Sequence, residues 1–150
     1  MEGIVWKCKA FDNLTNLELY SIMHLRNEVF VVEQKCLFQD ADNKDQQCFH
    51  LMGYIDSRLA AYARLVPAGV TYSYISIGRV ITSPLFRKAG FGKALMQQAI
   101  EGCNRLFGKQ TIKIGAQLYL KKFYESFGFK QTGKVYDEDG IDHIYMLKEQ

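Results

Sequence analysis

The sequence predicts an α/β protein in which an antiparallel meander and a hairpin of strands are interleaved with helices. Runs rich in β-branched and aromatic residues recur along the chain, and stretches of helical periodicity separate them. The dipeptides Asp56-Ser57 and Asp139-Gly140 each join two such runs with residues typical of tight turns. These observations indicate strands that pair with their chain neighbours and helices that cover them.

The first half of the chain opens with a strand expected at residues 3–8. A helix that begins near Asn16 follows, and Arg26 lies on its apolar face. That face carries Leu19, Ile22, Met23, Val29 and Phe30. After a polar loop at 39–47, the β-rich runs 49–55, 59–66 and 74–82 predict an antiparallel meander.

The second half begins with an amphipathic helix at residues 90–107, which Gly108 ends. A strand at 111–116 and a helix at 118–127 follow. The last two strands, 130–136 and 143–148, are joined by the second turn and form a hairpin.

Composition indicates one globular domain spanning residues 1–150, because 48% hydrophobic and 23% charged residues are enough to close a core. A net charge of +3, spread along the chain, argues against nucleic acid as a partner. The four cysteines show no CxxC spacing, so neither a redox dithiol nor a metal site is expected. No apolar run approaches a membrane span of about 18 residues and no leader is visible, so we expect a cytoplasmic protein without membrane contact.

A glycine turn between the third meander strand and the long helix indicates a phosphate site. Gly90 and Gly92 let the backbone approach a bulky anion, and the free N–H groups of the helix start point toward it. Arg87, Lys88 and Lys93 add positive charge around the same point. A P-loop needs GxxxxGK followed by Ser or Thr, and a dinucleotide fold needs GxGxxG after a first parallel strand; neither pattern is present.

Arg87-x-x-Gly90-x-Gly92 after a long strand resembles motif A of the GNAT superfamily of acyl-CoA N-acyltransferases. A second match is the run 120–129, LKKFYESFGF, which differs from the family pattern A-x-x-F-Y-x-x-x-G-F only by Leu for Ala. Segments 26–34, 78–80 and 136–143 look like the ElaA-like branch of this superfamily. The resemblance covers essentially the whole chain and is strongest from Arg79 to Phe129.

The resemblance implies the GNAT fold, a twisted, mixed and mostly antiparallel sheet of about six to seven strands flanked by helices. In that fold the strands that carry Val80 and Ile114 splay apart to admit the pantetheine arm of the cosubstrate acetyl-CoA. Backbone groups of Val80 and Thr82 would hold the thioester end, and residues 87–93 would hold the pyrophosphate. The residues assigned to the coenzyme are Val80, Ile81, Thr82, Arg87, Lys88, Ala89, Gly90, Phe91, Gly92, Lys93, Gln117 and Phe123.

Acyl transfer to an amine needs an acid for the departing thiolate and a base for the amine. By resemblance Tyr124 is the acid; its alternative is a core aromatic, because Leu120, Phe123 and Phe127 share its helical stripe. The candidates for the base are Glu33, His50 and His143, in that order. Partial burial would raise the pKa of Glu33 toward neutrality, whereas an ion pair with Arg26 or Arg79 is its structural alternative. A lone His50 in a strand is more often structural.

The expected acceptor site holds Arg26, Phe30, Glu33 and Arg79. Arg26, Arg64 and Arg79 each interrupt an apolar pattern, so each needs a partner: an acidic group of the acceptor, or an internal salt bridge with Glu28 or Glu33. The acidic loop 40–45 does not match a calcium-binding EF-hand, because Lys44 sits where an oxygen ligand is needed. That loop would attract a basic amine or simply be solvated.

We therefore expect an enzyme that transfers an acetyl group from acetyl-CoA to a primary amine, of a small molecule or a protein, by direct attack in a ternary complex and without a metal. A non-catalytic acyl-CoA-binding sensor and a homoserine-lactone-type synthase are the alternatives; the RxxGxG turn favours coenzyme A over S-adenosylmethionine. A homodimer is a further alternative, since small enzymes of this fold often pair.

Overall fold

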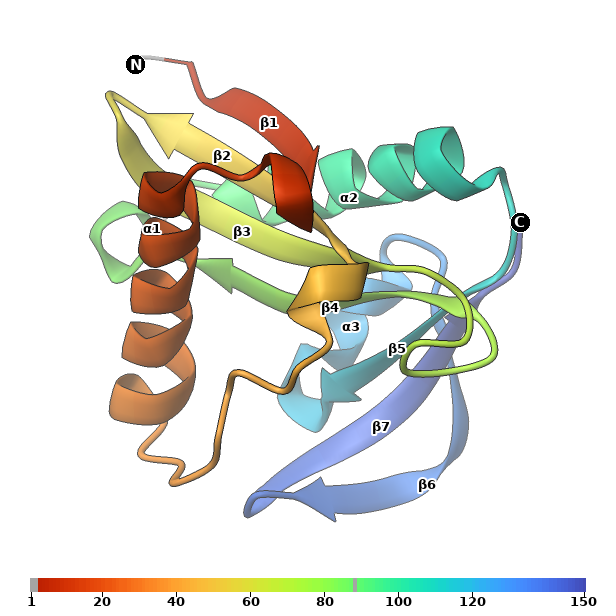
Figure 1. Cartoon of the computed structure of the whole chain (residues 1–150). Helices are drawn as coiled ribbons and strands as arrows, with labels where there is room; N and C mark the ends of the chain where they lie inside the picture. Colours follow the sequence, from red (N-terminus) through yellow and green to blue (C-terminus); the bar gives the residue numbers. More distant parts are fainter. Residues whose placement is uncertain (1–2, 88) are drawn as a thin grey trace.

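The computed structural model describes residues 3–87 and 89–150, and these form one seven-stranded sheet flanked by helices (Figure 1). The strand order is β1-β2-β3-β4-β5-β7-β6, and all neighbouring pairs are antiparallel except β4 with β5. The predicted mixed, mostly antiparallel sheet is confirmed. The strands are β1 (Val5–Ala10), β2 (Phe49–Ile55), β3 (Arg58–Val66), β4 (Ile75–Thr82), β5 (Ile112–Gln117), β6 (Lys130–Glu138) and β7 (Ile141–Lys148).

Two helices cover opposite faces of the sheet: α1 (Asn16–Arg26) and α2 (Phe91–Phe107). The alternation of side chains along β3 explains this arrangement, because Tyr62 packs in one core cluster with Ile22 of α1, whereas Ala63 packs in the other with Leu95 of α2. Both faces of β3 are therefore buried. Among the described residues no helix has the length and apolar character needed to cross a membrane.

The shorter helical segments depart from the predicted helices. The first predicted helix continues beyond Arg26 as a π-helix, η2 (Asn27–Glu33), in which the N–H of Gln34 bonds the carbonyl of Val29. The predicted helix 118–127 is a 3₁₀ turn, η5 (Leu118–Leu120), followed by a short α3 (Lys121–Glu125). Further 3₁₀ turns are η1 (Phe11–Asn13), η3 (Asp45–Gln47) and η4 (Pro84–Phe86).

Both predicted hairpin turns are present. Asp56 and Ser57 have φ of 46° and 70°, and Asp139 and Gly140 have φ of 52° and 81°. Positive φ at both central residues matches the right-handed twist of the flanking strands. The second turn fixes the tip of the β6–β7 hairpin, which borders the site described below.

The sheet splits between β4 and β5, as predicted. Their register contains only the pairs Ile75 with Ile112 and Ser76 with Lys113, after which the strands diverge. On the other edge of β4 a bulge places Arg79 and Val80 opposite Ala63 alone, and Arg79 has φ of 50°. The edge of β4 that faces β5 therefore keeps backbone groups without a strand partner among the described residues.

Candidate active site

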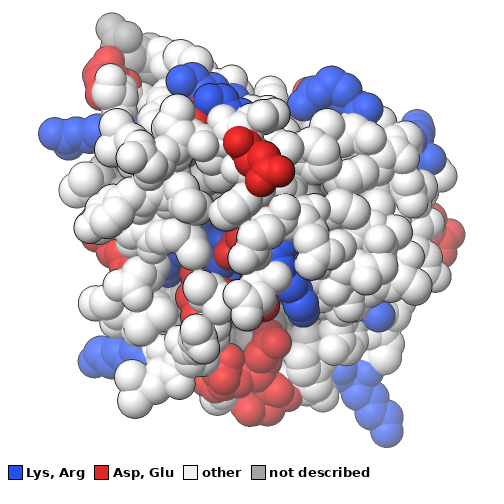
Figure 2. All heavy atoms as spheres, in the orientation of Figure 1, with Lys and Arg blue, Asp and Glu red and all other residues white. Residues whose placement is uncertain are grey.

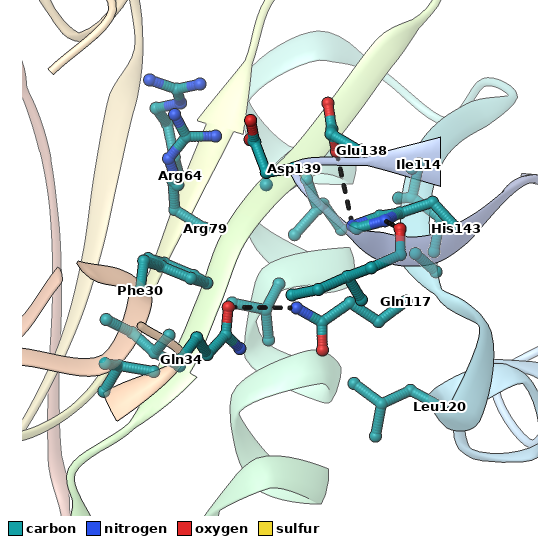
Figure 3. A pocket seen from close by; sticks show the side chains of 18 of the residues that line it. Phe30, Gln34, Arg64, Arg79, Ile114, Gln117, Leu120, Glu138, Asp139 and His143 are labelled. Carbon is teal, nitrogen blue, oxygen red and sulfur yellow. Dashed lines mark hydrogen bonds and ion pairs between the residues drawn. The ribbon is translucent and has the colours of Figure 1, made fainter. Parts of the chain in front are cut away.

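A cavity of about 640 Å³ lies where β4 and β5 diverge (Figure 3). One wall is β4 from Gly78 to Thr82, and the opposite wall is β5 from Ile114 to Gln117. The π-helix closes one side, and the β6–β7 hairpin closes another. Gln34 and Gln117 meet across the cavity at 3.4 Å, from Nε2 of Gln117 to Oε1 of Gln34. The predicted coenzyme residues Val80, Ile81, Thr82 and Gln117 all line this cavity.

The cavity continues into a shallower pocket at the start of α2, which shares Thr82 and Arg87 with it. Phe91, Lys93 and Phe123 also line this pocket, together with both glycines of the turn. Gly90 has φ of 80°, a conformation that favours glycine. Two predicted coenzyme residues are not placed here: Ala89 lines neither pocket, and Lys88 lies outside the described residues.

The first turn of α2 is suited to an anion because its own side chains do not cap it. In α1, Thr15 accepts from the N–H of Glu18 and the Glu18 carboxylate accepts from the N–H of Thr15, so that helix satisfies its own N-terminus. In α2, Gly90 has no side chain to offer, and no side-chain cap is present. The N–H groups and the positive dipole end of α2 are therefore directed at the shallow pocket.

Tyr124 projects from α3 into the same cavity. The residue is 7% exposed, and its ring packs against Phe123 and Phe129 at centroid distances of 5.2 and 6.2 Å. Its hydroxyl has no hydrogen-bond partner among the described residues. Burial raises the pKa of Tyr124 to about 12, so the phenol stays protonated at neutral pH. Tyr124 is therefore part of the core and also lines the cavity, and its role as the acid stays a prediction.

Comparison with known proteins agrees with this geometry. The sequence model of the family described as Acetyltransferase (GNAT) domain matches residues 18–150. The chain belongs to the GNAT acetyltransferase family. The ElaA protein of Escherichia coli is 38% identical to it, and the crystal structure of that protein superposes with a TM-score of 0.92 over 98% of this chain and 100% of ElaA.

Two further relatives extend the comparison. A Pseudomonas aeruginosa protein, whose structure is described as an acyl-CoA N-acyltransferase, is 40% identical and superposes with a TM-score of 0.91 over 96% of this chain and 99% of that one. A UPF0039 protein of Schizosaccharomyces pombe is 41% identical over 151 residues, which cover 99% of each chain. The GNAT fold and the ElaA-like resemblance expected from the sequence are confirmed.

Glu33 of this GNAT chain lines the cavity, but its partner and its pKa differ from the prediction. Its two carboxylate oxygens accept hydrogen bonds of 2.8 and 2.7 Å from Arg87, rather than from Arg26 or Arg79. These bonds lower the pKa of Glu33, so the expected rise toward neutrality is wrong. The reason is that Glu33 is exposed at the end of the π-helix, where the guanidinium of Arg87 reaches it and burial is slight.

His50 is placed away from the cavity, so its candidacy as a base is corrected. The ring is completely buried; Nδ1 lies 2.7 Å from the Tyr62 hydroxyl and Nε2 lies 2.9 Å from the carbonyl oxygen of Asp45. Both ring nitrogens therefore have partners inside the protein. Burial lowers the pKa of His50 and keeps the ring neutral.

His143 is the histidine that reaches the cavity. It pairs with Gln117 in the β5–β7 register, which brings it to the open end of the split. Nδ1 lies 2.8 Å from the carbonyl oxygen of Ile141, and a carbonyl only accepts, so the proton of the neutral ring is assigned to Nδ1. Nε2 lies 3.3 Å from the Glu138 carboxylate, a contact that is an ion pair only when the ring is protonated (Figure 3).

The predicted contact of Arg26 with the acceptor is corrected, because Arg26 is completely buried beneath the cavity wall. Its Nε donates to Asp40 at 2.8 Å, and its Nη1 donates to Asp45 at 2.6 Å. The internal salt bridge expected as the alternative is present, but its carboxylates come from the acidic loop and not from Glu28 or Glu33. From the sequence, the arginines that need a partner and the acidic loop were each recognised, but the arginines were not assigned to the carboxylates of that loop.

The other two arginines complete the same network. Arg79 donates from Nε to Asp40 at 2.8 Å, and Arg64 makes two hydrogen bonds of 2.9 Å to Asp42. Arg64 and Arg79 both line the cavity, although their guanidinium groups are already bonded to carboxylates. The aspartates of the acidic loop are thus bonded to arginines of the protein rather than left free for an amine. Phe30 lies where predicted, on the cavity wall with the Arg79 guanidinium 6.0 Å from its ring centroid.

Several lining residues were not identified from the sequence. Gln34, Cys36 and Phe38 follow the π-helix, and Tyr136 and Asp139 belong to the β6–β7 hairpin. The segments 26–34 and 136–143 had been singled out only as family-like, which was the available signal. Figure 2 shows acidic side chains gathered at the lower edge of the face drawn, where Figure 1 places this hairpin. Its exposed carboxylates are Asp137, Glu138, Asp139 and Asp142.

Proposed function

We propose that this GNAT protein transfers an acetyl group from acetyl-CoA to a primary amine by direct attack. One observation carries the proposal: the pocket at the uncapped N-terminus of α2 shares Thr82 and Arg87 with the cavity in the split between β4 and β5, which Tyr124 lines. The pyrophosphate of coenzyme A would bind at the N-terminus of α2. The extended pantetheine arm would lie along the unpaired edge of β4. The residues proposed to hold the coenzyme are Val80, Thr82, Arg87, Gly90, Gly92 and Lys93.

Acetyl-CoA supplies a thioester, and the amine nitrogen attacks its carbonyl carbon. A C–N bond forms as the C–S bond breaks; the amine gives up one proton, and the departing thiolate takes up another. Tyr124 is the proposed donor to the thiolate, because its raised pKa keeps the proton on the oxygen until the sulfur leaves.

His143 replaces Glu33 as the first candidate for the base. With Nδ1 bonded to the Ile141 carbonyl, Nε2, which lies beside the Glu138 carboxylate, is the nitrogen proposed to take the proton of the amine. The Glu138 carboxylate then accepts a hydrogen bond from the imidazolium that forms. Glu33 is disfavoured because Arg87 holds it in the charged form with a lowered pKa.

The coenzyme half of the proposal is tested by calorimetric titration with acetyl-CoA. Gly92→Glu is the informative variant, because Gly92 lies in the first turn of α2 without positive φ, and an added Cβ meets only Phe123 at 3.9 Å. Gly92→Gln is the matched control of the same size without charge. We expect micromolar binding to the wild type and to Gly92→Gln, and a loss of at least about tenfold in Gly92→Glu through repulsion of the pyrophosphate.

Two results would refute this half: absence of binding to folded wild-type protein, or equal weakening in both variants. Thiol release from acetyl-CoA in the presence of amines tests the transfer itself. Tight binding without thiol release across a broad set of amines would indicate the acyl-CoA sensor instead.

A further inference from the structure

The network of arginines and aspartates that borders the cavity leaves one buried donor unused. Nη1 of Arg64 donates to Asp42 and Asp45, and Nη2 donates to Asp42. Nε of Arg64 is the one buried side-chain nitrogen or oxygen without a hydrogen-bond partner among residues 3–87 and 89–150. A guanidinium carries five N–H donors in a planar fork, so Nε–H and one N–H of Nη2 stay available on one edge of the group.

The cavity is open directly beside this guanidinium. Arg64 is only 4% exposed and lines the cavity (Figure 3). Gly78 lies opposite Arg64 in the β3–β4 register, so the two residues share one face of the sheet. A Cβ built on Gly78 has no atom within 4 Å. An oxygen of a ligand placed over Gly78 would satisfy the buried donor, which otherwise costs free energy.

Ser76 supplies a second polar group without a partner on the same face. It pairs with Val66, two positions along β3 from Arg64, and side chains two positions apart on a strand point to the same side. Ser76 is 4% exposed and lines the cavity, and its hydroxyl makes no hydrogen bond within the described chain. Two buried groups that can donate hydrogen bonds therefore lie along one stretch of the cavity floor.

The charges around this stretch favour an anion. The three arginines of the network are balanced by the three aspartates of the acidic loop. Lys44 also lines the cavity and has no ion pair among the described residues. The backbone N–H of Lys44 and Nη1 of Arg64 donate to the same Asp42 oxygen, at 3.1 and 2.9 Å, so Lys44 lies next to Arg64. One positive charge is therefore in excess beside the unused donor.

The carboxylates that line the cavity do not cancel this charge. Two of them are each bonded to an arginine. The other two, Glu138 and Asp139, belong to the tip of the β6–β7 hairpin. Strand β7 leaves that tip at Ile141 and reaches the level of Ser76, across β5, only at Leu147. Six positions of a strand span about 20 Å, so the carboxylates of the tip are distant from an anion at Ser76.

We infer that the acceptor amine carries a carboxylate, as an amino acid does, and that Arg64, Ser76 and Lys44 bind this carboxylate. The Arg64 Nε–H and the Ser76 hydroxyl would donate to its oxygens, and the Lys44 ammonium would balance its charge. Val80, proposed to hold the coenzyme, lies two positions beyond Gly78, about 7 Å along the strand. A short aliphatic amino acid spans that distance. The inference rests on the proposed function, since it names the substrate class of that site.

Pairs of amines that differ only in a carboxylate or a carboxamide test the inference. The acids are 3-aminopropanoate, 4-aminobutanoate and 5-aminopentanoate, and each is compared with its own amide. Calorimetry measures the binding of each probe to protein saturated with coenzyme A, and thiol release from acetyl-CoA gives kcat/KM. For at least one chain length we expect the acid to be favoured by at least about tenfold in both measurements, because hydrogen bonds to a charged group are the stronger ones.

Two substitutions change the proposed site and leave the ion pairs of the network in place. Lys44→Met removes the excess charge, and Lys109→Met, exposed and lining neither pocket, is its control. Gly78→Ala adds a methyl group beside Arg64; Gly3→Ala, at another open glycine outside both pockets, is its control. We expect Lys44→Met to lower the advantage of the acid by about fivefold and Gly78→Ala to weaken its binding by about tenfold. Both controls should match the wild type.

Arg64 itself is observed by NMR of protein that contains isotope-labelled arginine. Arg64→Lys identifies the Nε–H resonance by its loss. We expect this resonance to shift when the acid that binds best is added and to stay in place with 1-aminobutane, which lacks the carboxylate. An unchanged resonance at saturation with the acid would show that Arg64 does not bind it.

Equal binding of acid and amide at every length, no binding of any probe, or equal responses of each variant and its control would overturn the inference. The proposed function fails separately. Binding of an acid that depends on Lys44 and Gly78, without thiol release, would support the carboxylate site and refute the transferase. Thiol release with simple amines, without any preference for an acid, would do the reverse.

Discussion

Tyr124 is a buried phenol on α3 that serves the core and the cavity at once, and its hydroxyl is the only part that the proposed chemistry needs. We expect Tyr124→Phe to lower kcat by about a hundredfold or more, because the thiolate then leaves without a proton donor. The affinity for acetyl-CoA should change by less than about twofold, since the ring and its packing are kept. Steady-state kinetics and calorimetry measure the two effects.

Tyr20→Phe is the control for that experiment, because Tyr20 is exposed on α1, away from the cavity. Equal turnover in Tyr124→Phe and the wild type would show that Tyr124 is a core residue only. Because the pKa of Tyr124 is about 12, its hydroxyl keeps the proton up to about pH 11. The ionisation of Tyr124 should therefore not limit the rate between pH 7 and 10.

The Glu33 carboxylate is bonded to the guanidinium of Arg87, which is proposed to bind the pyrophosphate of acetyl-CoA. The pair is exposed at about 40% on each side, and such pairs contribute roughly 0.2–1 kcal/mol. Glu33→Gln should therefore free Arg87 and tighten acetyl-CoA binding by about two- to fivefold, measured by calorimetry at low salt. Glu101→Gln, exposed on α2 and lining neither pocket, should leave the affinity unchanged. Weaker binding in Glu33→Gln would mean that the pair positions Arg87 rather than competing for it.

At the scale of elements, the acidic loop 40–45 joins three separate parts of the fold. Its aspartates bind Arg26 at the end of α1, Arg64 on β3 and Arg79 at the bulge of β4. The bulge places a non-glycine residue at positive φ, and the bonds from Arg79 to Asp40 help to hold that backbone. The loop thereby fixes the wall of the cavity.

Arg26→Ala should lower the free energy of unfolding by about 3–5 kcal/mol, because it leaves Asp45 and Asp40 largely buried beside a missing charge. Urea denaturation followed by circular dichroism measures this change. Arg58→Ala removes an exposed arginine without an ion pair among the described residues and should cost less than about 0.5 kcal/mol. Similar losses in the two variants would contradict a stabilising role for the network.

At the scale of the whole molecule, the network of arginines and aspartates makes the free energy of unfolding depend on pH. Burial works to raise the pKa values of Asp42 and Asp45, but hydrogen bonds and charges from the arginines outweigh it and hold both below their ordinary value. Carboxyls with a depressed folded pKa stabilise fully above the unfolded value near 4 and lose that contribution as pH falls further.

We therefore expect the free energy of unfolding to be steady from about pH 7 to 5 and to fall steeply below about pH 4. Urea denaturation at several pH values measures the slope. In Arg26→Ala the slope below pH 4 should be smaller, because the pKa of Asp45 loses one of the charges that lower it. An unchanged slope in the variant would assign the acid sensitivity to other carboxyls.

The fold was predictable from the sequence to a large extent because its signals are local. Hydrophobic periodicity fixed the positions of the strands and of α2, and turn residues fixed both hairpins. The π-helix was not predicted. The spacing of apolar residues that indicates an α-helix is also compatible with the wider turns of a short π-helix. The short α3 was overestimated for a similar reason: a stripe of Leu120, Phe123 and Phe127 does not define where a helix begins.

The site was predictable only in part. The phosphate turn and Tyr124 belong to contiguous motifs, so their placement in two adjoining pockets followed once the fold was known. The ion pairs did not follow: Arg87 with Glu33, 54 positions apart, and Arg79 with Asp40, 39 positions apart, were each assigned other partners. Each charged side chain has many possible partners of opposite charge along the chain. Which of them it pairs with depends on how the fold places backbone segments that are distant in sequence.

The sequence by itself thus determined the order of the elements, the anion-binding turn at the start of α2 and the aromatic stripe that carries Tyr124. Backbone propensity, side-chain periodicity and the special conformations of glycine act over a few residues, so they are visible in one dimension. Only the tertiary structure decided that Arg26 is structural and that His143 and not His50 faces the cavity. Those outcomes depend on register and on burial, which are set when β4 and β5 part and the acidic loop closes over the three arginines.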